Sequence, residues 1–242
     1  MSDYCLKGFQ WKAKPKGRGD TVAGLDCYIS GSNENVAVII IHDLFGWTFN
    51  IRILADHLAQ DIDATVYVPD CFGGEVVPTE ILLDKSRAGE FDLGAFLKRN
   101  SKAIRRPEII KFAESLRSSF TRIGAVGYCY GGWAVFNLGT KGNNLVDCIS
   151  TAHPSLLESE EIANIGVPTQ ILAPEFDHMF TPELKAYTNE VLPKAGVAYD
   201  YQYFPGLEHG FAIRGDESKP GERDGMERAK NAVSLWLRQW LH

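Results

Sequence analysis

The segment Gly127-Tyr-Cys-Tyr-Gly131 places a cysteine, a residue type that can act as a nucleophile, midway between two glycines. An apolar, β-rich run over 123–126 precedes the segment, and a helix-like run over 133–138 follows it. This order predicts a sharp strand-to-helix turn, a nucleophile elbow, with Cys129 at its apex. The two glycines leave room for the strand and the helix to approach each other closely.

Such a turn would activate Cys129 in two ways. The N-terminus of the following helix would point at the sulfur, and its positive dipole end favours a thiolate and an oxyanion. The backbone N–H of Tyr130 would serve as one oxyanion donor. A lone cysteine in a glycine-rich turn is more typical of a buried, inert thiol. The elbow therefore predicts chemistry only if partner residues follow it.

Suitable partners do follow Cys129, in the order in which this type of site needs them. An apolar run over 167–173 predicts a strand, and Asp177 lies in the segment just after it. An aromatic-rich run over 199–204 predicts a further strand, and His209 lies in the loop that we expect between it and the last helix. The order nucleophile, acid, histidine is that of the α/β-hydrolase fold, so the pattern predicts a Cys-His-Asp triad.

Each partner has a competitor in the sequence. Glu175 competes as the acid, although it lies closer to the predicted strand and is more typical of a loop carboxylate. His178 competes as the base, but a histidine adjacent to the acid cannot easily face it across the site. His42 and His153 each end a predicted strand, where a hydrogen-bonded structural histidine is the ordinary expectation.

Composition favours a globular protein of one domain, which we assign to residues 1–242. Apolar content is 45% and charged content 23%, as in a protein with a sizeable core. The net charge of −6 argues against nucleic acid and anionic membranes as partners. Residues 1–20 are polar and do not resemble a signal peptide, and no run reaches the roughly 18 apolar residues of a membrane span.

The cysteines bear on the compartment and on cofactors. They are odd in number, without metal-like spacing, and fit reduced thiols in the cytoplasm better than a disulfide framework: Cys5, Cys27, Cys71, Cys129 and Cys148. We expect no metal and no cofactor.

Strand-like and helix-like runs alternate along the chain, which predicts an α/β fold with a mostly parallel, doubly wound sheet and helices on both faces. We expect strands over 36–41 and 64–68, and helices over 50–60, from Pro107 in a first turn, from Thr181-Pro182 to 192, and over 223–241. The segment 72–100 is broken by glycines and resists assignment, so we expect a lid or a pocket wall there.

Several motifs together resemble the dienelactone hydrolase family. They are the Gly-Tyr-Cys-Tyr-Gly-Gly elbow, the segment His42-Asp-Leu-Phe-Gly46, the Pro69-Asp70 stop, the Asp177-His178 pair and the His209-Gly-Phe211 segment. The resemblance spans Val36 to Leu241, and Trp47 makes it greatest to the eukaryotic members, the fungal ones included.

The resemblance implies roles for several positions. Cys129 would be the nucleophile, His209 the base and Asp177 the orienting carboxylate. The N–H groups of Leu44 and Tyr130 would form the oxyanion hole.

The resemblance also points to a residue that activates the thiol. Family members carry a glutamate at the position of Asp43 that is thought to promote thiolate formation. Here the carboxylate is one methylene shorter, and a strand-end residue bonded to nearby backbone N–H groups is an equal alternative.

The resemblance further implies a small-molecule ester or lactone as substrate, with or without a carboxylate, cleaved through a thioester on Cys129. Arg214, Phe45, Trp47 and Arg87 would contact that substrate, with Arg214 as the arginine that binds a carboxylate. Members of the family are often monomers or homodimers. A reactive-thiol protein on the same fold, a redox sensor or an electrophile scavenger, is the alternative of a different class.

Overall fold

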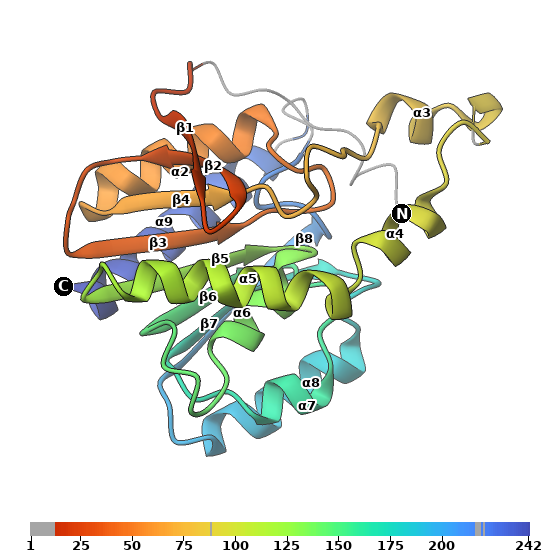
Figure 1. The fold of residues 1–242 in the computed structure, drawn as a ribbon. Coiled ribbons are helices and arrows are strands. Elements are labelled where there is room, and N and C mark those ends of the chain that lie inside the picture. Colours follow the sequence, from red (N-terminus) through yellow and green to blue (C-terminus); the bar gives the residue numbers. More distant parts are fainter. Residues whose placement is uncertain (1–12, 88, 216–218, 220) are drawn as a thin grey trace.

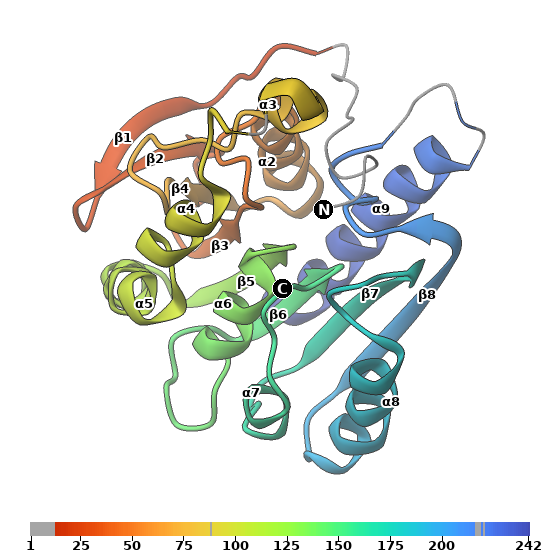
Figure 2. The same cartoon turned by 90° about the vertical axis from the view of Figure 1, so that its right-hand side faces the viewer.

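The computed structural model describes residues 13–87, 89–215, 219 and 221–242, and within them an eight-stranded sheet forms the centre of the molecule (Figures 1 and 2). The strand order is β1-β2-β4-β3-β5-β6-β7-β8, with the first two pairings antiparallel and all the others parallel. The strands are β1 (Arg18–Val22), β2 (Leu25–Ser30), β3 (Val36–Ile41), β4 (Thr65–Pro69), β5 (Arg122–Tyr128), β6 (Cys148–Ala152), β7 (Thr169–Phe176) and β8 (Tyr199–Glu208).

Helices cover both faces of this sheet, as predicted. The helices among the described residues are α2 (Phe49–Ile62), α3 (Thr79–Leu83), α4 (Leu93–Arg99), α5 (Lys102–Arg117), α6 (Gly131–Leu138), α7 (Ser159–Ala163), α8 (Pro182–Val191) and α9 (Glu222–Leu241), with short 3₁₀ turns η1 (Lys85–Arg87) and η2 (Leu192–Lys194). Helices α5, α6, α7 and α8 pack on one face, and α2 and α9 pack on the other (Figures 1 and 2).

Strand β3 shows how one apolar run builds two cores. Its side chains alternate between the faces, so that Ala37, Ile39 and Ile41 join one core cluster while Val36, Val38 and Ile40 join the other. All six residues are buried, as expected of a central parallel strand. Burial on both faces of the sheet therefore explains why all six residues of β3 are apolar.

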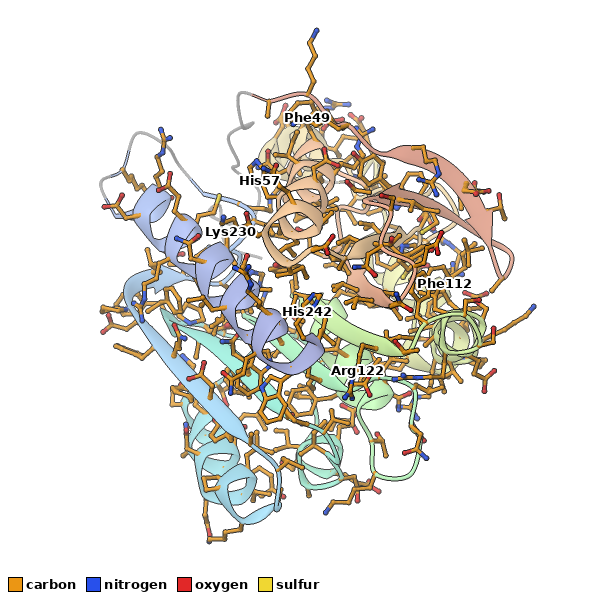
Figure 3. The ribbon with its side chains drawn as sticks, turned by 90° about the vertical axis from the view of Figure 1, so that its left-hand side faces the viewer. Phe49, His57, Phe112, Arg122, Lys230 and His242 are labelled. Carbon is orange, nitrogen blue, oxygen red and sulfur yellow. The ribbon has the colours of Figure 1, made fainter. Side chains whose placement is uncertain are left out.

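Helices α2 and α9 lie against each other on the face shown in Figure 3. The Lys230 Nζ of α9 lies 2.7 Å from the Asp61 Oδ2 of α2. At the end of the chain, the His242 Nε2 lies 2.6 Å from the Ile62 carbonyl oxygen. No helix among the residues described is both long and apolar enough to cross a membrane.

The predicted elements around Cys129 are confirmed, and three features of the fold differ from expectation. Strands β1 and β2 were not predicted, because β1 is polar and exposed and β2 is short and interrupted by Asp26, so neither has a strong apolar run. Pro107 lies inside α5, not in its first turn. That helix begins five residues earlier, where the N–H groups of Ile104 and Arg105 both donate to the Ser101 carbonyl.

The third difference lies next to the predicted histidine. Strand β8 extends through 205–208, which we expected to be loop, and Phe176 pairs there with Glu208 after a register shift at Pro174. The irregular segment 72–100 contains α3, η1 and α4. Helix α4 contributes Leu93 and Leu97 to a pocket, so this part of the segment is a pocket wall, as expected.

Candidate active site

Cys129 occupies a strained turn between β5 and α6, with φ at +49°, in the left-handed region. For a residue other than glycine this conformation costs on the order of 1–3 kcal/mol, and it persists only where the surroundings enforce it. A Cβ built at Gly127 would collide with the backbone of Gly131, and one built at Gly131 would collide with the backbone of Ile41. The two glycines are therefore required by close backbone approach, as the sequence pattern predicts.

A carboxylate and an imidazole meet beside this turn, directly after β7 and β8, the second and third strands beyond β5 in the sheet. The His209 Nδ1 lies 2.8 Å from the Asp177 Oδ1, and both side chains are buried. The same carboxylate oxygen accepts hydrogen bonds from the N–H groups of Met179 at 2.8 Å and Phe180 at 3.0 Å. The backbone N–H of His209 donates to the Phe176 carbonyl. Backbone contacts thus fix the positions of both groups.

The charges of this site support one another. Burial alone would lower the pKa of His209, but the Cys129 charge and hydrogen bonds with Asp177 and Cys129 outweigh it and raise that pKa well above its usual value. Burial would raise the pKa of Asp177, but hydrogen bonds from His209 and the two backbone N–H groups lower it overall. The carboxylate and the imidazolium of this pair therefore stabilise each other's charge.

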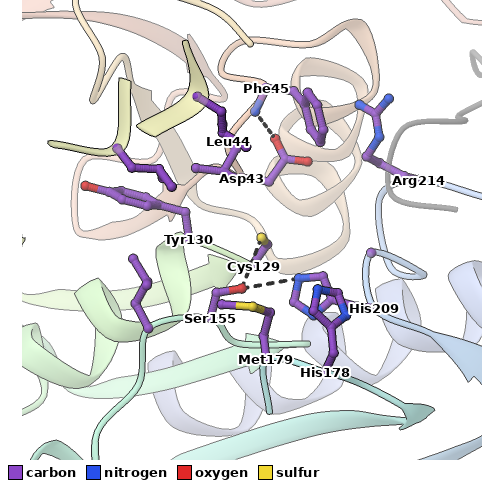
Figure 4. Close-up of a pocket in the computed structure, with 14 residues that line it drawn as sticks. Asp43, Leu44, Phe45, Cys129, Tyr130, Ser155, His178, Met179, His209 and Arg214 are labelled. Atoms are coloured by element: carbon purple, nitrogen blue, oxygen red, sulfur yellow. Dashed lines mark hydrogen bonds between the residues drawn. The ribbon is translucent and has the colours of Figure 1, made fainter. Parts of the chain in front are cut away.

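Ser155, in the loop after β6, also touches both reactive groups. Its Oγ lies 3.3 Å from the Cys129 Sγ and 3.3 Å from the His209 Nε2 (Figure 4). Sequence reasoning did not find this residue. The one available signal was its position, because it closely follows a predicted strand that neighbours the elbow strand.

The oxyanion-hole role of two backbone N–H groups, those of Leu44 and Tyr130, stays a prediction. Leu44 and Tyr130 both line the pocket that contains Cys129. Within the described part of the chain, neither backbone N–H donates to an intramolecular acceptor. The Tyr130 side chain points away into the core, where its hydroxyl donates to the Asn100 carbonyl at 2.7 Å.

Asp43 lines the same pocket, but its carboxylate is held by its own loop. Its Oδ1 accepts a hydrogen bond from the Phe45 N–H at 2.9 Å. Burial raises the pKa of Asp43, against the opposing charge of Arg214. This is the backbone-bonded arrangement that the sequence left open as an alternative. A role in thiol activation stays a prediction.

The pocket has a volume of about 160 Å³ and opens to solvent. Figure 4 shows Cys129 between two groups of side chains. Ser155 and His209 lie on one side of it, and Asp43 lies on the other. Besides the reactive groups, the wall is largely apolar: Leu44, Phe45, Leu93, Leu97, Leu156 and Met179. A largely apolar pocket with a few convergent polar groups suits a small organic substrate.

Two of the four predicted substrate-contacting residues reach this pocket. Arg214 lines it, with its guanidinium carbon 4.0 Å from the centre of the Phe45 ring, which also lines it. Trp47 packs against the core beneath α2 and donates through Nε1 to the Val68 carbonyl. Arg87 pairs with Glu90 at 2.7 Å on the exposed turn η1 and is not among the lining residues.

The competing residues have structural partners. The Glu175 Oε2 accepts from the Gly206 N–H at 2.7 Å, as expected of a loop carboxylate. His42 bridges the Asp43 carbonyl and the Cys71 N–H through its two ring nitrogens. His178 lines the pocket with its ring centre 5.6 Å from that of His209.

His153 is fully buried beside His209, with ring centres 5.0 Å apart. Burial, followed by the His209 charge, lowers the pKa of His153 well below its usual value. Neither ring nitrogen of His153 has a hydrogen-bond partner among the described residues, so the hydrogen-bonded histidine expected from the sequence is not found at this position.

Exposure distinguishes Cys129 from the other described cysteines. Cys27, Cys71 and Cys148 are buried, and burial raises the pKa of each thiol. Cys129 is partly exposed in the pocket, while Cys5 lies outside the described residues. In the part of the chain that the structure covers, no three His, Cys, Asp or Glu side chains gather as a metal site.

A strained nucleophile elbow on a mostly parallel sheet, with an acid and a histidine after the next strands, defines a hydrolase of the α/β-hydrolase fold. The model of the dienelactone hydrolase family matches residues 25–241. The chain therefore belongs to the dienelactone hydrolase family, and its class is that of a carboxylic ester hydrolase.

Named relatives agree with this assignment. The chain is 30% identical to the hydrolase tropI of Talaromyces stipitatus, over 98% of this chain and 95% of that protein. It is 29% identical to the human carboxymethylenebutenolidase homolog, over 93% and 91% of the two chains. The crystal structure of the dienelactone hydrolase-like promiscuous phosphotriesterase P91 superposes with a TM-score of 0.68 at 18% identity, covering 95% of this chain and all of that one. At that identity the last comparison shows the fold.

Proposed function

We propose that the protein cleaves an ester or lactone through a thioester on Cys129, with His209 and Asp177 completing a Cys-His-Asp triad. The observation that carries the proposal is the buried hydrogen bond of 2.8 Å between the Asp177 Oδ1 and the His209 Nδ1, next to a partly exposed sulfur at the base of an apolar pocket. A bonded carboxylate fixes the imidazole tautomer so that Nε2 faces the reacting atoms.

The first half of the reaction forms the acyl-enzyme. The Cys129 thiolate attacks the substrate carbonyl carbon, and the carbonyl oxygen takes up negative charge between the N–H groups of Leu44 and Tyr130. Each such donor contributes roughly 3 kcal/mol to the stability of the transition state. Protonated His209 gives its proton to the departing alkoxide, which leaves a thioester on the sulfur.

The second half of the reaction regenerates the Cys129 thiolate. His209, now neutral, takes a proton from a water molecule as that water attacks the thioester carbonyl. The tetrahedral intermediate collapses, the acid product leaves, and the imidazole and sulfur return to their ion-paired state. In a lactone the alcohol stays attached to the acyl group, so the released product is a single hydroxy acid.

The pocket wall supports a substrate with an apolar body. The leucines of α4 and Leu156 face the space above Cys129, and burial of apolar substrate surface there is favourable by about 25 cal/mol per Å². Arg214 offers a cation for a substrate carboxylate at one end of this space. We therefore propose small, largely apolar esters and lactones, with or without a carboxylate, as the substrate class.

The test compares Cys129→Ala with Cys71→Ala on p-nitrophenyl acetate and on a dienelactone. We expect Cys129→Ala to abolish hydrolysis and Cys71→Ala to stay within a few-fold of the wild type, because Cys71 is buried away from the pocket. A mass increase of one acyl group on the peptide that contains Cys129, trapped at low pH, would identify the thioester. Full activity of Cys129→Ala would end this mechanism. Alkylation of Cys129 by an electrophile, with no turnover of any ester, would favour the reactive-thiol alternative.

A further inference from the structure

The loop 153–156 after β6 is held against the nucleophile elbow in an unusual backbone conformation. His153 has φ at +40° and Leu156 has φ at +59°, both in the left-handed region. The Ser155 N–H donates to the Cys129 carbonyl at 2.8 Å. Pro154 packs so closely on Gly132 of α6 that a Cβ on that glycine would collide with it. Strain of this kind, observed at a functional site, points to a role for the residue that it positions.

Ser155 is the residue that this loop presents to the reactive groups. Its side chain is part of the pocket wall, and the residue is only 4% exposed. The Oγ lies at the same distance, 3.3 Å, from the Cys129 Sγ and from the His209 Nε2. In Figure 4 the two dashed lines meet at this oxygen. A hydroxyl has one proton to donate and two lone pairs, so it can serve both neighbours at once.

We propose that the Ser155 hydroxyl is a catalytic group that stabilises the Cys129 thiolate, in place of a carboxylate. In the neutral state the thiol donates to Oγ, and the hydroxyl donates to Nε2. Transfer of the thiol proton to Oγ and of the hydroxyl proton to Nε2 leaves a thiolate and an imidazolium, with serine chemically unchanged. The hydroxyl then donates to the thiolate and accepts from the imidazolium.

The position of Asp43 supports this assignment. The Asp43 Oδ1 accepts a hydrogen bond from the Phe45 N–H, whereas the Cys129 sulfur lies next to the Ser155 hydroxyl. A carboxylate close to a thiolate disfavours the charged sulfur, whereas a hydroxyl that donates a hydrogen bond favours it. The titratable and charged groups around the sulfur are Asp43, His153, Asp177, His178, His209 and Arg214.

The inference rests on the proposed nucleophilic role of Cys129, and its test is chosen to be independent of turnover. Alkylation of Cys129 by iodoacetamide is followed from pH 5 to 10 by mass spectrometry of the peptide that contains it. Ser155→Ala is compared with Ser155→Thr, which keeps the hydroxyl, and with Ser118→Ala, a matched substitution at the exposed end of α5. Cys129→Ala is the blank. Thermal unfolding of each variant shows that it is folded.

We expect Ser155→Ala to move the alkylation profile to higher pH and to lower the rate at pH 7 by about tenfold, a typical effect for one hydrogen bond to a charged group. The rate at pH 10 should be preserved, Ser155→Thr should recover most of the loss, and Ser118→Ala should match the wild type. Asp43→Asn should move the profile to lower pH, because it removes a negative charge near the sulfur.

Three results would overturn the inference. They are a Ser155→Ala profile that superimposes on the wild type, equal shifts in the alanine and threonine variants, and an upward shift in Asp43→Asn larger than that of Ser155→Ala. If no ester is hydrolysed by any variant while the Ser155→Ala shift is present, the proposed hydrolysis fails and the role of Ser155 stands.

Discussion

The two sides of the pocket are built by different means. On one side Ser155, Asp177 and His209 follow the ends of β6, β7 and β8, and each is held by a hydrogen bond to backbone or to another member of the group. On the other side the wall comes from the loop after β3 and from helix α4, and it is mostly leucine side chain. We call these the polar side and the apolar side.

The contrast separates chemistry from selection of substrate. On the polar side, neighbouring parallel strands fix the distances between groups, and directional hydrogen bonds hold Ser155, Asp177 and His209 in place. On the apolar side, contacts are non-directional and depend on a helix outside the sheet. Substitutions on the polar side should therefore alter rate for all substrates, and those on the apolar side should alter the preference among them.

The largest effect is expected at Asp177. Asp177→Asn should lower kcat/KM by roughly 10³–10⁴, because an amide favours the wrong imidazole tautomer and withdraws the charge that supports the imidazolium. Glu175→Gln is the matched control at the end of the same strand, and its activity should stay within several-fold, because the Glu175 side chain accepts from the Gly206 N–H and does not line the pocket. Steady-state kinetics on one activated ester measure both. Equal losses in the two variants would mean that the acid has been misassigned.

Next in size is the titration of His209. Its pKa is raised in the folded protein, so its stabilising contribution is complete below the unfolded value of about 6.5 and is lost as pH rises through the raised value. Cys129→Ala removes the opposite charge, and the pKa of His209 should fall. Histidine NMR resonances followed from pH 5 to 10 report this change directly. The free energy of unfolding should begin to decline at lower pH in the alanine variant. An unchanged His209 titration would show that sulfur and imidazole are not coupled.

A selective effect is expected at Arg214, which joins the two sides. Arg214→Met should raise KM for a carboxylated ester by about tenfold, the typical value of a charge-assisted contact, and should spare a neutral ester of the same size. Arg87→Met is the comparison, since Arg87 pairs with Glu90 outside the pocket lining. An equal rise in KM for both esters would show that Arg214 does not bind a substrate carboxylate.

The smallest effect is expected on the apolar side. Leu97 is 37% exposed at the pocket mouth, and Leu97→Ala should raise KM for a hexanoate ester by a few-fold, as expected for the loss of about 1 kcal/mol of apolar burial. The acetate ester should be unaffected, because its acyl group is too short to reach α4. Ile104→Ala is the control, since this residue is 48% exposed on the neighbouring helix and does not line the pocket. A change in kcat with both esters would place Leu97 in the chemistry.

The polar side was also the more predictable one from sequence. Cys129 and Asp177 follow strongly apolar runs, His209 follows an aromatic-rich one, and parallel strands bring consecutive strand ends to one edge of the sheet. Residue type and chain order therefore sufficed to select them.

What the sequence did not reveal has specific physical causes. Ser155 is an ordinary residue type, and its importance comes from a loop conformation that no local pattern encodes. Helix α4 is short and contains Gly94, which weakens a helical signal. Arg87 and Trp47 were placed near the substrate by position in the chain, while their contacts depend on partners distant from the pocket.

The pairing of Phe176 with Glu208 also limits how this protein can change during evolution. Asp177 and His209 each come one residue after that pair, so the number of residues in the final stretch of β8 determines which way the imidazole points. Removal of one residue there, Gly206 for example, would turn the ring to the opposite face of the sheet. Length variation among related proteins should therefore be tolerated between β4 and β5 and be nearly absent between Phe204 and His209.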